Sequence, residues 1–271
     1  MVFEGGQQWP ASNYLDKALE VLTVTSMLNG TETKNDAFID KAYDRSLGET
    51  SALVKEGKAL MANALLEEMI GIYQNHRNVD SLRASLKTLK KTKLFKTSRR
   101  SQNNAFFKEN FIRDDFTYYL EQDVLTYNYN NLGWWNYQME ELNKYEKETN
   151  VFERNMGRRL KSYLNALIAD NIDLVKLGNP VDEEALKFLW MMNTITDAKN
   201  PTPYLKVISN SAKVEDYGTA LFYLEELLKT GYSDKSELYS LEHTAILRIS
   251  PEFNKIVAKY LKDARYEVIE E

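Results

Sequence analysis

Five pairs of adjacent carboxylates are the residues whose type and spacing first suggest acid–base chemistry. They are Glu67/Glu68, Asp114/Asp115, Glu140/Glu141, Glu183/Glu184 and Glu225/Glu226. General acid–base catalysis needs two carboxylates that converge in one cleft and have separated pKa values. Successive side chains of a helix point about 100° apart, so no pair can converge by itself. We therefore interpret most of these pairs as solvated helix faces.

The two histidines, His76 and His243, are the other candidates for chemistry. A catalytic triad needs a histidine within hydrogen-bond reach of a serine, and neither histidine stands in a companion motif. A di-metal helical bundle needs Glu-x-x-His pairs, and Glu242 directly before His243 has the wrong spacing. The sequence has no cysteine, which excludes thiol nucleophiles, disulfides and zinc-thiolate sites. We expect no catalytic residue, metal or cofactor in this chain and interpret both histidines as surface or capping residues.

A basic segment at 83–100 contains no acidic residue. Its candidate partner-binding side chains are Lys87, Lys90, Lys91, Lys93, Lys96, Arg99 and Arg100. Three interpretations are open: a solvated or intramolecular face, a contact with an acidic protein, or a contact with phosphate groups. The net charge of the chain is −5, which gives no general attraction to nucleic acid, so we predict no nucleic-acid partner.

Aromatic residues gather around an Asn- and Gly-containing segment at 126–133, which we predict to be a loop. The candidate binding residues here are Tyr127, Tyr129, Trp134 and Trp135. These four side chains cannot all point inward from a loop and the start of a helix. They could line a groove for a peptide or a glycan. Packing into the core or against the loop is the alternative interpretation.

Apolar residues recur with helical spacing over nearly the whole chain, and strand signals are almost absent. The first stripe is Leu15, Ala18, Leu19 and Leu22. Polar residues at 97–104 predict a break, as do Pro201 and Pro203. The predicted helices cover 12–29, 34–46, 53–72, 79–94, 105–126, 134–148, a segment from Asn150 to Gly178, a helix that starts at Asp182, and 214–229, 234–243 and 251–263.

Asn150 and Glu153 predict the best-defined helix start, because they occupy capping-box positions. So many amphipathic helices are most simply buried as antiparallel pairs stacked side by side. We therefore predict an all-α fold of stacked antiparallel helix pairs, of helical-repeat type and irregular period. We divide it into an N-terminal region at 1–100 and a C-terminal region at 101–271.

The segment 220–253 resembles the closing unit of tetratricopeptide repeat arrays. The matching residues are Ala220, Leu224, Leu227, Leu228, Gly231, Leu241, Leu247, Arg248, Pro251 and Phe253. The resemblance implies that Ala220 permits close helix packing, that Gly231 forms a left-handed turn and that Phe253 fills the last groove between helices. It also implies a surface that binds another protein.

A second resemblance covers residues 2–10, which read VFEGGQQWP. They are similar to the last strand and loop of α/β-hydrolases, in which a catalytic histidine precedes the final helix. Gln7 stands at the histidine position, and no G-x-S-x-G motif occurs in the chain. The resemblance implies the tail of a hydrolase whose catalytic domain precedes this piece, so the chain alone would not catalyse.

The function we expect is therefore non-catalytic: a protein–protein interaction or scaffolding module with a protein or peptide partner. The alternative is the C-terminal helical region of an α/β-hydrolase, which predicts an exposed apolar face on the helix at 12–29. A third interpretation is a helical ligand-binding domain that uses the aromatic loop. No apolar run reaches the roughly 18 residues of a membrane span. We also find no signal peptide, which indicates a cytoplasmic protein if the chain is complete.

Overall fold

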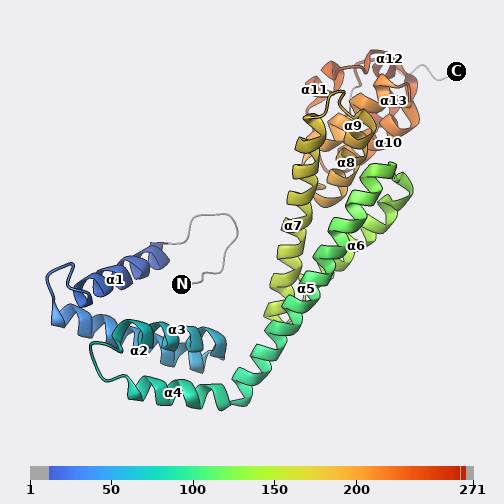
Figure 1. Ribbon diagram of the computed structural model, residues 1–271. Helices are drawn as coiled ribbons and strands as arrows, with labels where there is room; N and C mark the ends of the chain where they lie inside the picture. The colour runs from blue at the N-terminus through green and yellow to red at the C-terminus, as the bar shows by residue number, and fades with distance from the viewer. Residues whose placement is uncertain (1–11, 263, 267–271) are drawn as a thin grey trace. The chain divides into compact units, whose positions relative to one another are not determined.

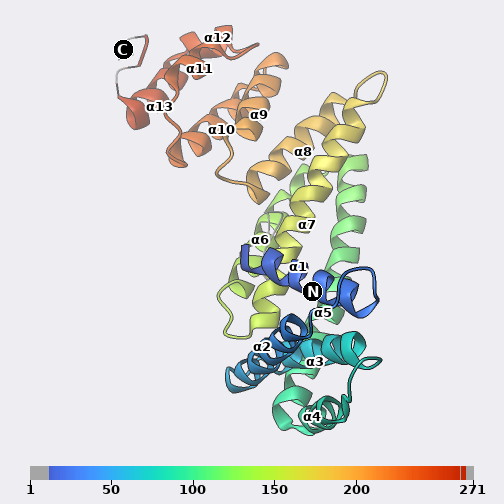
Figure 2. The ribbon, with the colours of Figure 1, turned by 90° about the vertical axis from the view of Figure 1, so that its left-hand side faces the viewer.

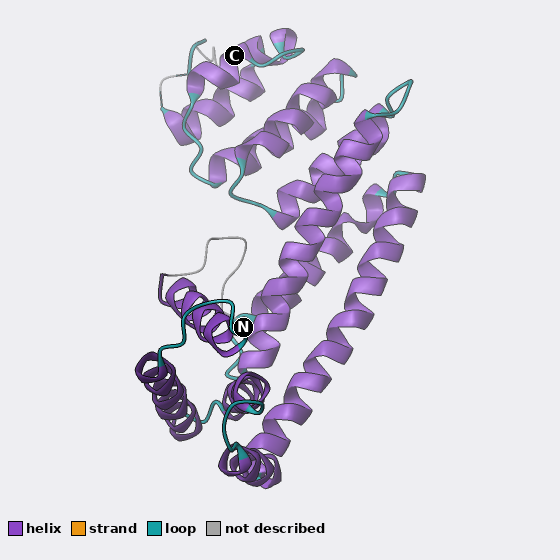
Figure 3. Ribbon diagram, turned by 60° about the vertical axis from the view of Figure 1, so that its left-hand side comes forward, coloured by secondary structure: helices purple, strands orange, loops and turns teal. Residues whose placement is uncertain are grey.

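The structure is a computed structural model that describes residues 12–262 and 264–266 of the chain. This described part contains thirteen α-helices and one short 3-10 helix, and no strand (Figure 3). Helices that follow one another in the chain pack against one another as adjacent pairs. The prediction of an all-α fold, compatible with a helical repeat, is confirmed. Residues 2–10, with Gln7, lie outside the described residues.

The chain divides into two compact units, Met1–Asn103 and Asn104–Glu271. The division falls inside one long helix, α5 (Lys93–Thr126) (Figure 1). Unit 1 also contains α1 (Ser12–Leu28), α2 (Asp36–Lys55), α3 (Ala59–Tyr73) and α4 (Asp80–Lys91). Its core is formed mainly by α2, α3 and α4, around the buried side chains of Leu66, Met69 and Leu82.

The first helix forms as predicted, but its leucine stripe is on the outside. Leu15, Leu19 and Leu22 are 44%, 61% and 63% exposed. The opposite face of α1 carries Val24, which is buried against the core of unit 1. Ion pairs of Lys17 with Glu49 and of Glu20 with Arg45 connect α1 to α2. The leucines therefore form an apolar face that unit 1 leaves uncovered.

Unit 2 continues from α5 through η1 (Tyr129–Asn131) into a series of shorter helices. These are α6 (Leu132–Tyr145), α7 (Val151–Lys176), α8 (Glu183–Thr196), α9 (Pro201–Lys213), α10 (Tyr217–Lys229), α11 (Lys235–Ser240), α12 (Ala245–Ile249) and α13 (Pro251–Leu261). Figure 2 shows α7, α8, α9, α10 and α13 following one another in space, as their packing contacts indicate.

Two apolar clusters form the core of unit 2. One joins α5 to α8 around Phe116, Trp135 and Phe188, and the other joins α8 to α13 around Leu224 and Phe253. An ion pair also connects α5 to α7, because Arg159 of α7 donates two parallel hydrogen bonds to the carboxylate of Glu109 on α5. Bidentate pairs of this kind fix orientation as well as distance.

Several helix starts follow the sequence signals. The Asn150 side chain accepts a hydrogen bond from the Phe152 backbone N–H at 3.1 Å, and Asp182 caps α8 by accepting from the Ala185 N–H at 2.9 Å. Gly231 adopts a left-handed φ of 94°, as the repeat resemblance implies. Each of these residues supplies what a helix end otherwise lacks: an acceptor for a free N–H, or a turn that other residues rarely adopt.

Other boundaries differ from the prediction for physical reasons. The polar segment 97–104 lies inside α5. It contains neither glycine nor proline, and its polar residues can continue a helix even though they give it no apolar face. Gly48 lies inside α2, so the helix predicted to end near it continues to Lys55. Gly57, which we placed within a helix, instead separates α2 from α3 with a φ of 77°.

The prediction missed α9 entirely. Pro201 is its first residue and Pro203 lies in its first turn, where the missing N–H of proline removes no helical hydrogen bond. The side chain of Asn200 caps this helix by accepting from the Thr202 N–H at 3.1 Å. Two prolines that we interpreted as a break therefore begin a helix. None of the helices within 12–262 is long and apolar enough to cross a membrane.

Replacement of Gly157 by alanine tests the close contact between α6 and α7 in unit 2. A Cβ at this position would lie 2.6 Å from Cβ of Tyr145 and 3.2 Å from the carbonyl oxygen of Leu142. We expect Gly157→Ala to lower the free energy of unfolding by about 1–3 kcal/mol, because α6 and α7 would have to separate. Urea unfolding followed by circular dichroism measures the change.

The control is Gly133→Ala in α6, where no atom lies within 4 Å of the added Cβ. This variant should be neutral or more stable by up to about 1 kcal/mol, from helix propensity alone. Equal stability of the two variants would contradict the close approach of α6 and α7.

Candidate functional site

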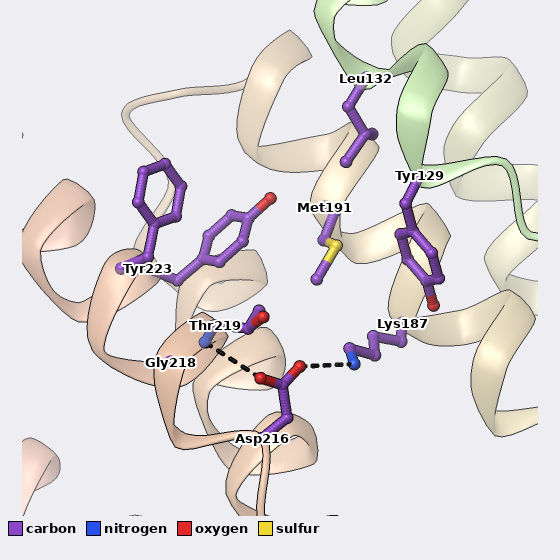
Figure 4. A pocket seen from close by; sticks show the side chains of 9 residues that line it. Tyr129, Leu132, Lys187, Met191, Asp216, Gly218, Thr219 and Tyr223 are labelled. Atoms are coloured by element: carbon purple, nitrogen blue, oxygen red, sulfur yellow. Dashed lines mark hydrogen bonds and ion pairs between the residues drawn. The ribbon is translucent and has the colours of Figure 1, made fainter.

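A cleft of about 490 Å³ lies in unit 2 and has the geometry of a binding site (Figure 4). Its apolar wall consists of Leu132, Met191, Phe222 and Tyr223, and its polar part consists of Tyr129, Lys187, Asp216 and Thr219, beside Gly218. Ligand sites in proteins have volumes of about 300–1,000 Å³ and combine apolar walls with a few polar groups. The size and the lining both fit this description.

A buried carboxylate builds the turn that brings Tyr129 to the cleft. Asp123, near the end of α5, is only 4% exposed. Its side chain accepts hydrogen bonds from Nδ2 of Asn128 at 2.9 Å, Nδ2 of Asn131 at 2.5 Å and Nε1 of Trp135 at 2.7 Å. Three donors from the turn and from α6 thus converge on one acceptor group. The path of the chain between α5 and α6 is fixed by this convergence.

Tyr129 connects this turn to α8. Its hydroxyl donates to Oε2 of Glu184 at 2.7 Å, and its ring meets that of Phe188 edge-on with centroids 5.9 Å apart. Burial, followed by the hydrogen bond to Glu184, raises the pKa of Tyr129 far above its ordinary value. The phenol is therefore a fixed hydrogen-bond donor and does not act as a base near neutral pH.

Lys187 and Asp216 form the charged part of the cleft. Lys187 is 9% exposed, and its Nζ lies 3.4 Å from Oδ2 of Asp216 and 5.7 Å from the ring centre of Tyr129. Asp216 caps α10 by accepting from the Thr219 backbone N–H at 3.2 Å. Burial opposes ionisation of Asp216, but hydrogen bonds from Thr219 and Lys187 outweigh it and lower the pKa. The carboxylate is therefore ionised at neutral pH.

The two aromatic residues of the apolar wall, Phe222 and Tyr223, differ in exposure. Tyr223 is buried, and this burial raises the pKa of its hydroxyl to about 12. Phe222, whose ring lies 5.2 Å from that of Tyr223, is 58% exposed. An exposed phenylalanine beside a cleft provides apolar surface that a ligand would cover. The lining of the cleft therefore combines one ammonium group, one carboxylate and an exposed apolar surface, which are groups suited to binding a ligand.

The structure brings only one of the four predicted aromatic residues to this cleft, namely Tyr129. Tyr127 adopts a left-handed φ of 49° and donates from its hydroxyl to Oδ2 of Asp182 at 2.9 Å. Trp134 is half-buried between the rings of Tyr119 and Trp135. Trp135 is fully buried in the core of unit 2, where its indole N–H donates a hydrogen bond to Asp123.

The seven basic candidates lie on α4 and α5 within unit 1, and none of them lines the cleft. All are exposed, and Nζ of Lys90 forms an ion pair with Glu67 at 2.8 Å. The pair stabilises packing of α4 on α3 weakly, because exposed ion pairs contribute little. In 12–262 and 264–266, no three or more histidine, cysteine or acidic side chains are grouped so as to hold a metal ion.

Sequence reasoning missed Lys187, Asp216, Met191, Phe222 and Tyr223. One signal was present for Lys187, which interrupts an otherwise apolar run from Ala185 to Met192. A lysine in such a run either reaches solvent or needs a buried partner. No local signal could identify the partner, because Asp216 is 29 residues away in the chain.

Comparisons with known proteins leave the finer resemblances without support. The chain matches no protein-family model, no curated protein and no solved structure. The all-helical architecture is compatible with a helical repeat, and no family match confirms the likeness to tetratricopeptide units or to α/β-hydrolases. What the molecule can bind therefore follows from the chemistry of its own surfaces.

Replacement of Asp123 by alanine tests the turn that positions Tyr129. The change leaves the buried indole N–H of Trp135 and the half-buried amides of Asn128 and Asn131 without their acceptor, and an unpaired buried donor costs about 1–3 kcal/mol. We expect Asp123→Ala to lower the free energy of unfolding by about 2–4 kcal/mol. Denaturant titration followed by tryptophan fluorescence measures the loss.

Asp170→Ala, at an exposed position of α7, is the matched control and should change stability by less than about 0.5 kcal/mol. An Asp123→Ala variant as stable as this control would show that the donors find other acceptors.

Proposed function

We propose that the chain is a non-catalytic protein-interaction module and that the cleft of unit 2 binds a peptide segment of its partner. The single observation that carries this proposal is the cleft itself, in which an exposed phenylalanine stands beside a partly buried ion pair. Side chains of a peptide bury apolar area and hydrogen-bond at the same time, and this combination matches the lining.

The architecture supports the same proposal. Adjacent helix pairs expose surfaces between successive elements, and proteins built in this way commonly use such surfaces to bind other proteins. The resemblance of 220–253 to a tetratricopeptide closing unit covers α10 from Ala220 onward, the part that carries Phe222 and Tyr223 of the cleft. This support is an analogy at the level of the fold, so the test has to address the residues of the cleft.

Selection from a random peptide library displayed on phage is the experiment. Peptides enriched on the wild-type chain should lose about tenfold or more of their affinity on Phe222→Ser, because truncation of an aromatic anchor removes a large share of binding energy. Binding of the synthetic peptides is measured by isothermal titration calorimetry.

Phe107→Ser is the matched control, because Phe107 is also exposed in unit 2, on α5, and does not line the cleft. It should leave the affinities unchanged. A library that yields no binder, or binders equally affected by both variants, would argue against the proposed function.

We propose as a second candidate the C-terminal helical region of an α/β-hydrolase, favoured by one observation. This alternative predicts an exposed apolar face on the first helix. Three leucines are indeed exposed on α1, namely Leu15, Leu19 and Leu22. In that role the leucines would cover an apolar layer of a preceding catalytic domain. Exposed apolar patches commonly mark such contacts.

The triple variant Leu15→Gln, Leu19→Gln and Leu22→Gln tests this second candidate. The wild-type chain should bind a hydrophobic-surface dye and self-associate, and the triple variant should lose both properties. Fluorescence titration and light scattering measure them.

Leu174→Gln with Leu177→Gln, which changes two exposed leucines at the end of α7 and just beyond it, should leave both properties largely intact. A monodisperse wild-type monomer without dye uptake would remove the support for the hydrolase alternative.

A further inference from the structure

The ammonium group of Lys187 has unused hydrogen-bonding capacity. A lysine ammonium carries three N–H donors. Within the described residues the structure gives Lys187 one hydrogen bond, to Asp216 at the long distance of 3.4 Å, and a contact with the ring of Tyr129. A buried cation with unfilled donors is costly unless further acceptors reach it. The cleft therefore contains a group that favours an incoming acceptor.

The carboxylate of Asp216 uses more of its hydrogen-bonding capacity than the ammonium group of Lys187 does. This carboxylate accepts from the Thr219 backbone N–H, pairs with Lys187 and is the more exposed partner of the ion pair. Glu184, three residues before Lys187 on α8, already accepts from the Tyr129 hydroxyl at 2.7 Å. Both acidic side chains thus already accept hydrogen bonds, whereas two of the three donors of Lys187 have no acceptor within the described residues. A cationic ligand would have to compete with Lys187 for Asp216 and would approach the lysine against charge repulsion.

We propose that the cleft recognises a carboxylate next to an apolar group, with the carboxylate bound by Lys187 and the apolar group placed against Met191 and Phe222. Figure 4 shows Lys187 and Asp216 directed toward each other, with the side chains of Met191 and Tyr223 above them in the view. This inference rests on the proposed function, because it names the chemistry of the peptide that the same cleft binds.

Two variants with opposite expected effects test the proposal. Lys187→Met keeps an unbranched side chain and removes the charge, and it should weaken acidic peptides by about tenfold to a hundredfold, the range of one hydrogen bond to a charged group. Asp216→Asn still caps α10, since asparagine is an equally good capping residue, and it should tighten the same peptides severalfold by removing the competing carboxylate.

The probes are peptides selected on the wild-type chain from the random library. Each is synthesised as selected, with its acidic side chain changed to the amide, and with its C-terminus either free or amidated. Loss of binding on the side-chain change assigns the carboxylate to Asp or Glu, and loss on amidation assigns it to a peptide C-terminus. Affinities are measured by calorimetry, after circular dichroism has shown that each variant is folded.

Lys90→Met, at an exposed lysine of unit 1, is the matched control and should change no affinity. Peptides that bind the wild type equally well after loss of every carboxylate, or that bind Lys187→Met unchanged, would overturn the carboxylate inference and leave the interaction module standing. Weaker binding of Asp216→Asn would overturn it in favour of a cationic ligand. Failure to select any peptide is the separate outcome that refutes the proposed function itself.

Discussion

The carboxylate of Asp123 is buried where α5 ends, and within the described residues no lysine or arginine pairs with it. A charge in this position is tolerated only if hydrogen-bond donors replace the water that it has lost. The side chains of Asn128, Asn131 and Trp135 are these donors, and each comes from a different point of the turn and the following helix. The requirement to satisfy one acceptor thus determines how the chain passes from α5 into α6.

The hydrogen bonds of Asp123 also influence the geometry of the cleft, through Trp135 and through the turn before it. Trp135 is held at the centre of the core, against Phe116 of α5, while the turn before it directs Tyr129 toward α8. On α8, Glu184 and Lys187 are three residues apart and therefore lie on one face of the helix. Glu184 fixes the phenol of Tyr129, and Lys187 approaches its ring. The polar part of the cleft is consequently preorganised by contacts that exist without a ligand.

The sequence predicts the helical class and several helix starts, because caps and apolar spacing are local signals. It fails where the outcome depends on distant partners. The leucine stripe of α1 has the ideal spacing for a buried face, yet Val24 and the ion pairs to α2 orient the helix the other way. The sequence predicts a binding role for Trp135 because a helix start is commonly exposed, but contact with Phe116 and the hydrogen bond to Asp123 hold it in the core. The cleft joins α6, α8 and α10, so its composition could not be read from any one segment.

The ion pair of Lys187 with Asp216 is not explained by stability. Partly buried ion pairs recover little of their desolvation cost, and apolar residues of similar volume are often equally stable in their place. The geometry here is not optimal even for an ion pair, because 3.4 Å is long for a charge-assisted hydrogen bond. Methionine at position 187 would extend the apolar run of α8 without a charge to satisfy. A lysine in that position, beside an apolar wall with an exposed phenylalanine, is better explained by the proposed carboxylate ligand than by a contribution to stability.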